Sequence, residues 1–353
     1  MATATATTAT ATATKPLLTD LASTIDRVPS NFIRPLSDRP NLHQLHSFSA
    51  SIPIIDLHDF DGPNRPKIIQ NIAHACQHYG FFQIVNHGIP EELVSKMVNV
   101  SKEFFGLPES ERLKNYSDDP CKTTRLSTSF NVKTEKVSNW RDFLRLHCHP
   151  LEDYILEWPA NPPSFREDVA EYSRKMRGLS VKLLEGISES LGLERDYIEK
   201  ALGKHGQHMA MNYYPPCPEP ELTYGLPPHA DPNAITILLQ NDVPGLQVLY
   251  DGHWLSVNPV PNTFIVNIGD QIQVISNDRY KSVLHRALVN CEKERMSIPT
   301  FYCPSPDATI KPAPQLVDDD HPVQYKSFTY REYYDKFWNR GLSKETCVDM
   351  FKA

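Results

Sequence analysis

Hydrophobic and polar positions follow different patterns in the two halves of the chain. In the first half, the pattern predicts three helices and two short strands. The expected helices cover residues 67–78, 91–105 and 165–191, and the expected strands cover 52–55 and 81–85. Two prolines and Ser164 precede the longest helix. This arrangement is typical of a proline-marked, serine-capped helix start.

After about residue 207 the chain changes to short β-rich runs separated by Pro, Gly and Asn. The expected strands cover residues 209–214, 235–240, 246–250, 254–257, 263–268, 282–289 and 297–302. Many short strands with turn signals at this spacing predict a sandwich or barrel. We therefore expect one α+β unit in which the long helix packs on the outside of a β-core.

Composition and charge restrict the class of protein. The 353 residues are 40% hydrophobic and 22% charged, which is an ordinary globular balance. A formal charge of −7 provides no broad basic surface for nucleic acid. The chain has no apolar stretch near the roughly 20 residues of a membrane-spanning helix and no signal-like N-terminus. We expect a cytoplasmic protein whose seven widely spaced cysteines are reduced.

The first residues form a separate region of low complexity. Residues 1–14 are almost entirely Ala and Thr after the initial Met, so they carry no periodic apolar face. We expect a mobile tail over about residues 1–15. A plastid transit peptide is the alternative, although the segment lacks the Arg and Ser enrichment of such peptides.

A candidate metal site combines two histidines and one carboxylate. His229 and Asp231 lie two residues apart, which on an extended segment points both side chains to one face. His285 follows 54 residues later in a strand-like run and can return to the same end of the β-core. Two imidazoles and a carboxylate leave three adjacent coordination positions open, the arrangement of non-haem iron(II) oxygenases. The lack of cysteine ligands argues against structural zinc.

A candidate carboxylate clamp follows the last histidine. Arg295 and Ser297 begin ten residues beyond His285. The planar guanidinium can bind a carboxylate through two parallel hydrogen bonds, and the nearby hydroxyl can share a remaining lone pair. A dicarboxylate could therefore chelate the metal at one end and bind this pair at the other.

These elements together resemble the plant 2-oxoglutarate-dependent dioxygenase family. In that family Asn-Tyr-Tyr-Pro precedes His-x-Asp, a distal histidine follows after some fifty residues, and Arg-x-Ser follows after another ten. The chain has the same order, with Asn-Tyr-Tyr-Pro at residues 212–215. The resemblance extends to Pro-Ile-Ile-Asp at 53–56 and Gly-Phe-Phe-Gln-Ile-Val-Asn-His-Gly at 80–88, and so covers about residues 30–340.

The resemblance implies a fold, a cofactor and a set of site residues. The implied core is a double-stranded β-helix, also called a jelly roll, over residues 207–310. An N-terminal helical region with short strands over 16–206 packs on it, and a C-terminal helical segment over 311–353 closes the site. The implied cofactors are iron(II), 2-oxoglutarate and O2, with ascorbate as an activator. The implied iron ligands are His229, Asp231 and His285, and the implied 2-oxoglutarate residues are Arg295, Ser297, Tyr214 and Asn212.

Other histidines are not implied as ligands. His87 belongs to the family's N-terminal motif and is expected to have a structural role. Surface or packing roles are expected for His147, His149, His205 and His208.

A strand-like segment near residue 143 is expected to supply part of the substrate pocket. Phe143, Arg145 and His147 share one face if residues 140–147 are extended. Related flavonoid oxygenases carry aromatic residues at the positions of Phe143 and Arg145, so an aromatic ring is replaced here by a cation. Arg145 either binds a substrate carboxylate or makes a structural ion pair. Phe301 matches a family position that stacks on aromatic substrates.

The stretches 116–120, 123–131 and 139–142 are similar to the downy-mildew-resistance-type branch of the family. Members of that branch hydroxylate salicylic acid, chiefly at ring position 5, and some also act as flavone synthases. The resemblance implies a salicylic acid hydroxylase that forms 2,5-dihydroxybenzoic acid and, by lowering salicylate, acts in plant immunity and senescence. We expect the protein to be a monomer. A flavone synthase or flavanone-oxidising dioxygenase is the alternative, and hydroxylation at C3 or C5 stays open.

Two hypotheses from other classes explain fewer of the residues. A non-catalytic cupin that binds a small ligand would be favoured by loss of a metal ligand or of the arginine clamp, and neither is lost. A zinc hydrolase would need a general base near the metal, which the sequence does not mark, and would leave the Arg-x-Ser pair unexplained.

Overall fold

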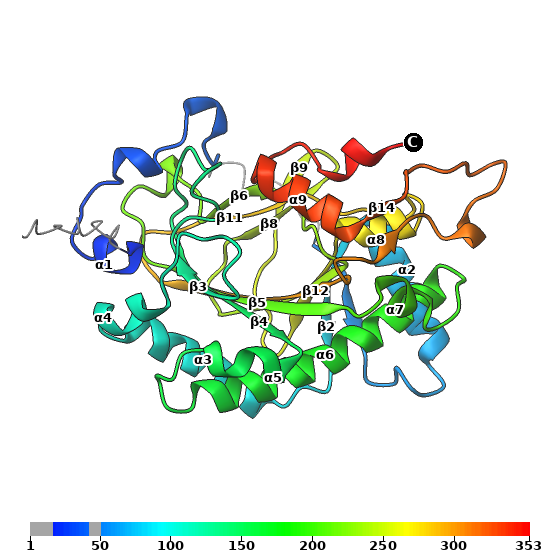
Figure 1. Ribbon diagram of the computed structural model, residues 1–353, viewed down its shortest axis with the longest axis horizontal. Helices are drawn as coiled ribbons and strands as arrows, with labels where there is room; N and C mark the ends of the chain where they lie inside the picture. Colours follow the sequence, from blue (N-terminus) through cyan, green and yellow to red (C-terminus); the bar gives the residue numbers. More distant parts are fainter. Residues whose placement is uncertain (1–16, 42–50) are drawn as a thin grey trace, which may run out of the picture.

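The computed structural model describes residues 17–41 and 51–353, so the predicted tail over residues 1–15 lies outside the described residues. Helices border a central group of strands (Figure 1). The helices are α1 (Leu18–Ala22), α2 (Arg65–His78), α3 (Glu91–Gly106), α4 (Glu109–Arg112), α5 (Leu151–Tyr154), α6 (Phe165–Ser190), α7 (Tyr197–Leu202), α8 (Asp270–Ile275) and α9 (Tyr330–Arg340). The strands are β1 (Ile54–Asp56), β2 (Phe81–Val85), β3 (Thr124–Ser127), β4 (Asp142–His149), β5 (Gly206–Tyr214), β6 (Leu226–His229), β7 (Ile235–Gln240), β8 (Leu246–Tyr250), β9 (His253–Ser256), β10 (Phe264–Ile268), β11 (His285–Ala287), β12 (Arg295–Cys303), β13 (Thr309–Ile310) and β14 (Phe328–Thr329).

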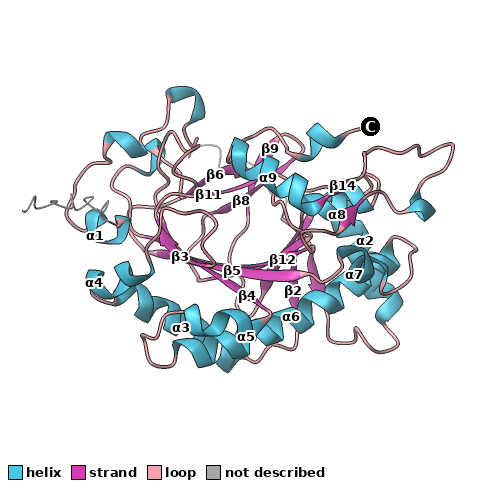
Figure 2. Ribbon diagram, in the orientation of Figure 1, coloured by secondary structure: helices cyan, strands magenta, loops and turns pink. Residues whose placement is uncertain are grey.

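Two sheets lie across from each other in the centre of the protein (Figure 2). The large sheet has eight strands in the order β1-β2-β10-β7-β12-β5-β4-β3, and the small sheet has four in the order β6-β11-β8-β9. Strands β1 and β2 pair in parallel, whereas the other pairs of these two sheets are antiparallel. The arrangement agrees with the predicted α+β architecture. Strands β1, β2, β3 and β4 of the large sheet come from the N-terminal region, before residue 150.

The long helix α6 packs on the outer face of the large sheet, as predicted (Figure 1). It contacts α2, α3 and strands β7 and β12. Its buried face includes Met176, Leu183 and Ile187. Ser164 precedes the helix as expected, but its side chain makes no capping hydrogen bond. Its backbone has φ −80° and ψ −6° instead of the extended geometry of an N-cap residue, so the predicted serine cap is wrong.

For most predicted strands, at least one end lies within one residue of the end observed in the structure. The remaining differences have local causes. Of the strand predicted over residues 282–289, only His285–Ala287 (β11) forms a strand. At the start of this segment the Ser282 N–H donates to the Gln273 side chain instead of to a neighbouring strand. Strand β6 was not predicted because it contains two prolines. It lies at the edge of the small sheet, where missing backbone donors are tolerated.

All seven cysteines have free thiols. No helix in residues 17–41 or 51–353 combines the length and apolar character needed to cross a membrane.

Candidate metal centre and active-site cavity

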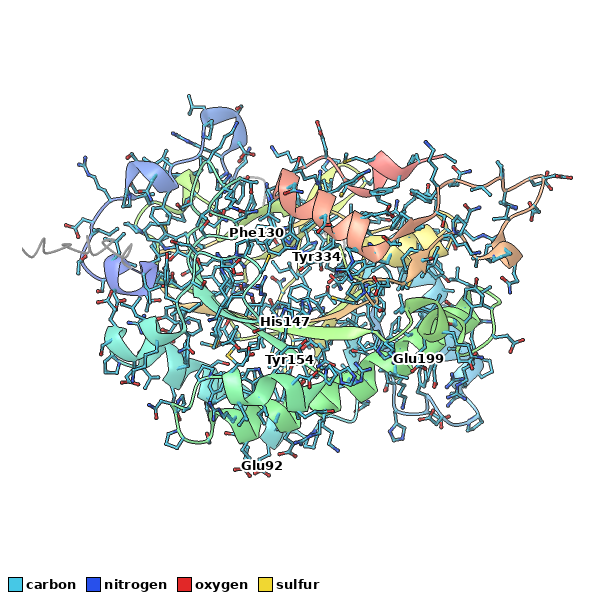
Figure 3. All side chains as sticks on the ribbon, viewed as in Figure 1. Glu92, Phe130, His147, Tyr154, Glu199 and Tyr334 are labelled. Atoms are coloured by element: carbon cyan, nitrogen blue, oxygen red, sulfur yellow. The ribbon has the colours of Figure 1, made fainter. Side chains whose placement is uncertain are left out.

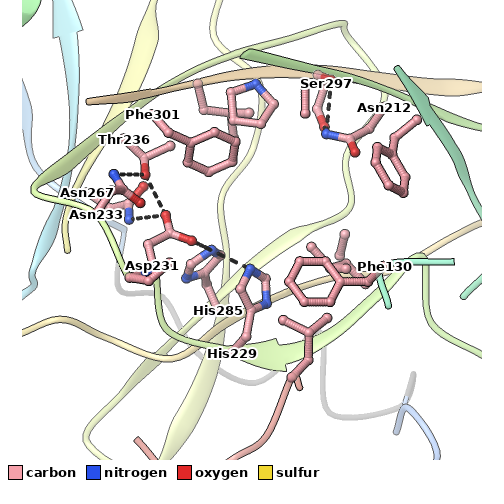
Figure 4. A pocket seen from close by; sticks show the side chains of 18 of the residues that line it. Phe130, Asn212, His229, Asp231, Asn233, Thr236, Asn267, His285, Ser297 and Phe301 are labelled. Carbon is pink, nitrogen blue, oxygen red and sulfur yellow. Dashed lines mark hydrogen bonds and ion pairs between the residues drawn. The ribbon is translucent and has the colours of Figure 1, made fainter. Parts of the chain in front are cut away.

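Three metal-binding side chains meet between the two sheets (Figure 4). His229 ends β6, Asp231 follows two residues later, and His285 begins β11 directly opposite His229 in the strand register. Asp231 Oδ1 lies 3.7 Å from His229 Nε2 and 3.6 Å from His285 Nε2. The three ligand atoms all lie within 4.8 Å of one another, so one cation could bind all three.

Neighbouring groups orient the three side chains. The Nδ1 atoms of His229 and His285 lie 2.8 and 3.2 Å from backbone carbonyl oxygens two residues earlier in the chain. An Nδ1–H bonded in this way leaves Nε2 free as a ligand. Asp231 Oδ2 accepts hydrogen bonds from Thr236 Oγ1 at 2.5 Å and Asn267 Nδ2 at 2.8 Å, while Oδ1 faces the histidines. The carboxylate therefore presents one oxygen to the candidate metal position.

The protonation states of this cluster favour metal binding. Burial, assisted by the neighbouring His285, lowers the pKa of His229 to about 3, so its imidazole is neutral at physiological pH. Burial alone would raise the pKa of Asp231, but the adjacent imidazoles and its hydrogen bonds to Thr236 and Asn267 lower it. Neutral imidazole and carboxylate are the forms that bind divalent metals.

The inner face of the large sheet supplies the candidate carboxylate clamp. Arg295 and Ser297 on β12 lie opposite Tyr214 and Asn212 on β5. The Ser297 hydroxyl lies 3.5 Å from the Tyr214 hydroxyl and 3.4 Å from Asn212 Nδ2, with Asn212 as donor. Figure 4 shows Asn212 and Ser297 across the cavity from the metal-binding cluster. The structure therefore brings together all four residues that the sequence assigned to 2-oxoglutarate.

Arg295 is buried with much of its hydrogen-bonding capacity unused. Its Nη2 donates to Gln240 Oε1 at 2.9 Å, but Nε and Nη1 have no acceptor among the described residues. Unpaired buried donors destabilise the folded protein, so a bound carboxylate would supply the missing hydrogen-bond acceptors. Gly245 makes room for this arginine, because a Cβ there would lie 2.7 Å from Arg295 Cδ and 2.8 Å from its Nε.

A cavity of about 160 Å³ joins the metal-binding cluster to the clamp. Its far wall is aromatic and comes partly from outside the sheets. Phe130, in the loop after β3, stacks on Trp338 of α9 at a centroid distance of 4.3 Å and an interplanar angle of 4°. Asn131 Nδ2 donates to the Trp338 backbone oxygen at 3.0 Å and joins the loop to the helix. Figure 3 shows Phe130 and Tyr334, a further wall residue on α9, on the side of the large sheet away from α6.

All three predicted substrate-pocket residues, Phe143, Arg145 and Phe301, line the cavity. Arg145 Nη2 donates to the backbone oxygens of Pro120 and Lys122, each at 2.6 Å, and Nε has no acceptor. No carboxylate among residues 17–41 and 51–353 forms an ion pair with Arg145. The structural ion pair that was the alternative for this residue therefore has no partner in the described part of the chain.

Arg141 and His208 are among the polar residues that line the cavity without having been predicted from the sequence. Arg141 is buried and donates from Nη1 to Asn212 Oδ1 at 2.6 Å. Alternation with Phe143 and Arg145 on one strand could have identified it. His208 also lines the cavity, although we expected a packing or surface role for it. By contrast, His87 Nδ1 accepts a hydrogen bond from the Ile89 N–H outside this cavity.

Comparisons with known proteins give the family. A family model described as the 2OG-Fe(II) oxygenase superfamily matches residues 205–304, and one described as non-haem dioxygenase in morphine synthesis N-terminal matches 52–165. Protein DMR6-LIKE OXYGENASE 2 of Arabidopsis thaliana is 62% identical over 342 residues, which cover 96% of this chain and 98% of that protein. The chain belongs to the 2-oxoglutarate- and iron(II)-dependent oxygenases.

Two further similarities support this family and the fold. Protein DOWNY MILDEW RESISTANCE 6 of Arabidopsis thaliana is 56% identical over 328 residues, covering 92% of this chain and 95% of that protein. The crystal structure of JOX2 in complex with 2OG, Fe and JA has a TM-score of 0.87 at 38% identity, covering 96% of this chain and 98% of that one. The predicted jelly-roll fold and the predicted dependence on iron(II), 2-oxoglutarate and O2 are confirmed.

The residues present fit these cofactors. Two imidazoles and one carboxylate without thiolate ligands suit iron(II). The unpaired donors of buried Arg295 suit the far carboxylate of 2-oxoglutarate.

The hydrogen bonds to Asp231 lead to a prediction. Asn267→Ala removes the donor to Asp231 Oδ2 while Thr236 still donates to the same oxygen. Since groups that orient ligands typically contribute ten- to a hundredfold to metal affinity or activity, we expect affinity for iron(II) to fall about tenfold. Titration of the metal-free protein with iron(II) under anaerobic conditions measures the effect. Unchanged affinity would show that Thr236 alone orients the carboxylate.

Proposed function

We propose that this oxygenase hydroxylates salicylic acid, with His229, Asp231 and His285 as the iron(II) ligands. The observation that carries the proposal is Arg145, a buried cation without a carboxylate partner among the described residues, in an aromatic cavity that also contains the metal-binding cluster. Burying such a charge is costly unless an anion binds it. An aromatic carboxylate would pair with the charge of Arg145, and its ring would contact the apolar walls of the cavity.

The proposed 2-oxoglutarate site consists of Arg295, Ser297, Tyr214 and Asn212. Arg295 binds the far carboxylate through its free donors, and the Ser297 and Tyr214 hydroxyls share the remaining lone pairs. Asn212 is held between Arg141 and Ser297, so its amide is fixed at the side of this site. When bound, iron(II) and 2-oxoglutarate supply the chemistry that activates O2.

The chain's own contribution is orientation and exclusion of water. Arg145 holds the substrate carboxylate, while Phe143 and Phe301 contact the faces of the ring. The stacked pair of Phe130 and Trp338 covers the far side and separates the reaction from solvent.

A role in plant immunity and senescence follows from this chemistry, because hydroxylation lowers the amount of free salicylate. The resemblance of residues 116–120, 123–131 and 139–142 to the downy-mildew-resistance-type branch supports this assignment, as does the 56% identity with Protein DOWNY MILDEW RESISTANCE 6.

Substrate comparison tests the proposal. Purified protein with iron(II), ascorbate and 2-oxoglutarate is incubated separately with salicylate and naringenin, and the products are identified by mass spectrometry against standards. We expect dihydroxybenzoate from salicylate and a higher kcat/KM for salicylate. Preferred oxidation of naringenin would support the flavanone alternative instead.

The role of Arg295 in 2-oxoglutarate binding can be tested without removing the positive charge. Arg295→Lys keeps a cation but loses the planar fork, so the apparent affinity for 2-oxoglutarate should fall at least about tenfold, or ~1.4 kcal/mol. Tyr214→Phe is the matched comparison and should have the smaller effect, because a neutral hydrogen bond contributes about 0.5–1.5 kcal/mol. The KM for 2-oxoglutarate measures both. An unchanged KM in Arg295→Lys would mean that the carboxylate binds elsewhere.

A further inference from the structure

Side chains that line the cavity form cross-strand rows on the large sheet. Residues directly opposite each other on neighbouring strands lie in one row, and successive rows are two residues apart along each strand. Strands β4, β5 and β12 therefore contribute a regular grid to the cavity wall. From the clamp outward, the rows are Tyr214 and Arg295; Phe143, Asn212 and Ser297; Arg145 and Ala210; and His208 and Phe301, with His147 opposite His208 but outside the cavity lining.

The first two rows contain the proposed 2-oxoglutarate residues, so Phe143 and the last two rows are left for the substrate. The last row continues across β7 and β10 to Thr236 and Asn267, which hold Asp231. His208 and Thr236 are separated by one strand, β12. Because adjacent strands lie about 4.8 Å apart, their backbones are ~10 Å apart. His208 therefore lies at one end of the substrate space and the metal-binding cluster lies at the other.

The imidazole of His208 has no internal hydrogen-bond partner. Its ring stacks on His147 at a centroid distance of 4.1 Å, and neither of its nitrogens forms a hydrogen bond with the described residues or counts among the buried unpaired atoms. Burial, with help from His147 and Arg145, lowers its pKa well below the usual range. A neutral imidazole at a cavity wall offers one donor and one acceptor to a ligand.

We propose that His208 binds the ring hydroxyl of an ortho-hydroxybenzoate and thereby directs oxidation to the ring carbon para to that hydroxyl. The inference rests on the proposed function. Arg145 lies in the next row toward the clamp, so a carboxylate on Arg145 places the adjacent hydroxyl near His208. The carbon para to the hydroxyl then points away from His208, toward the metal-binding cluster. In salicylate this carbon is C5.

The reaction balances with the cofactors of the family. One atom of O2 enters the C5–H bond as a hydroxyl group, and the other enters succinate. 2-Oxoglutarate loses CO2 and supplies two of the four electrons that O2 accepts, and the C5–H bond supplies the other two. The products are 2,5-dihydroxybenzoate, succinate and CO2. Oxidation at C3, beside the hydroxyl, would require the ring to turn so that this hydroxyl leaves His208.

The ratio of the two product isomers tests the proposal. Wild-type protein, His208→Leu and His208→Gln are each supplied with salicylate, and 2,5- and 2,3-dihydroxybenzoate are separated by chromatography. Wild-type protein should form mainly the 2,5-isomer. His208→Leu should shift the ratio at least about fivefold toward the 2,3-isomer, and His208→Gln should restore part of the preference because its amide can still bind a hydroxyl.

A control separates hydrogen bonding from packing. His147→Phe keeps an aromatic partner for His208, and His147 does not line the cavity, so this variant should keep the wild-type ratio. If His208→Leu is inactive, quenching of tryptophan fluorescence gives the Kd of salicylate and of benzoate, which lacks the hydroxyl. A loss of at least about fivefold confined to salicylate supports the proposal.

Two results would overturn the proposal. An unchanged isomer ratio in active His208→Leu, or an equal loss of affinity for salicylate and benzoate, would remove the role of His208 while leaving salicylate as the substrate. A wild-type protein that converts no salicylate would contradict the proposed function and this inference together.

Discussion

Turnover should be lost when His229, Asp231 or His285 is replaced by alanine. The three donor atoms share one position between the sheets, and two remaining ligands cannot hold iron(II) while three positions stay open for exogenous ligands. Asp231→Ala should be the most severe, because it also leaves the donors of Thr236 and Asn267 unpaired. Product formation and bound iron are measured for each variant.

A matched control and a reversible treatment accompany these variants. His74→Ala changes an exposed histidine on α2 and should leave activity unchanged. A chelator should inhibit the wild-type protein reversibly, with iron(II) restoring activity better than zinc. Substantial activity in any of the three alanine variants would refute the ligand assignment.

Arg145→Phe should change substrate preference by one to two orders of magnitude. A charge-assisted hydrogen bond to the salicylate carboxylate contributes about 1.5–3 kcal/mol, and the variant removes it. An uncharged flavanone does not use this bond and should bind equally well or better. The ratio of kcat/KM for salicylate to that for naringenin therefore falls about 10- to 100-fold.

The same variant also reports on a structural role for Arg145. The guanidinium donates to the backbone oxygens of Pro120 and Lys122, so its removal should lower the melting temperature to some extent. Loss of fold affects both substrates equally, whereas loss of a carboxylate partner affects only salicylate. Equal losses on salicylate and naringenin, together with a lower melting temperature, would assign Arg145 to stability alone.

The sequence predicted those parts of the site that depend on spacing and strand alternation. His229 and Asp231 meet because two residues of extended chain place them on one face, and Phe143 and Arg145 share the cavity for the same reason. The family motif supplied the position of His285, which the strand register then places opposite His229. Local patterns were sufficient for these residues.

The rest of the cavity depends on contacts between distant segments. Trp338 reaches the wall only because α9 returns over the sheets and stacks on Phe130. The loop that carries Phe130 is held by Arg125, which donates to the backbone oxygens of Ser117, Ser129 and Phe130. Nothing in the periodicity of either segment indicates this pairing. His208 was missed for a related reason, since its role depends on which residues lie opposite it on β4 and β12.

The most direct test of salicylate oxidation at this metal centre uses labelled oxygen. Wild-type protein with iron(II), 2-oxoglutarate, ascorbate and salicylate is incubated under ¹⁸O₂, and products are analysed by mass spectrometry. We expect one labelled atom in dihydroxybenzoate, one in succinate and equal amounts of both products, with neither formed by Asp231→Ala. Succinate without dihydroxybenzoate, or dihydroxybenzoate that persists in Asp231→Ala, would contradict salicylate hydroxylation at this centre.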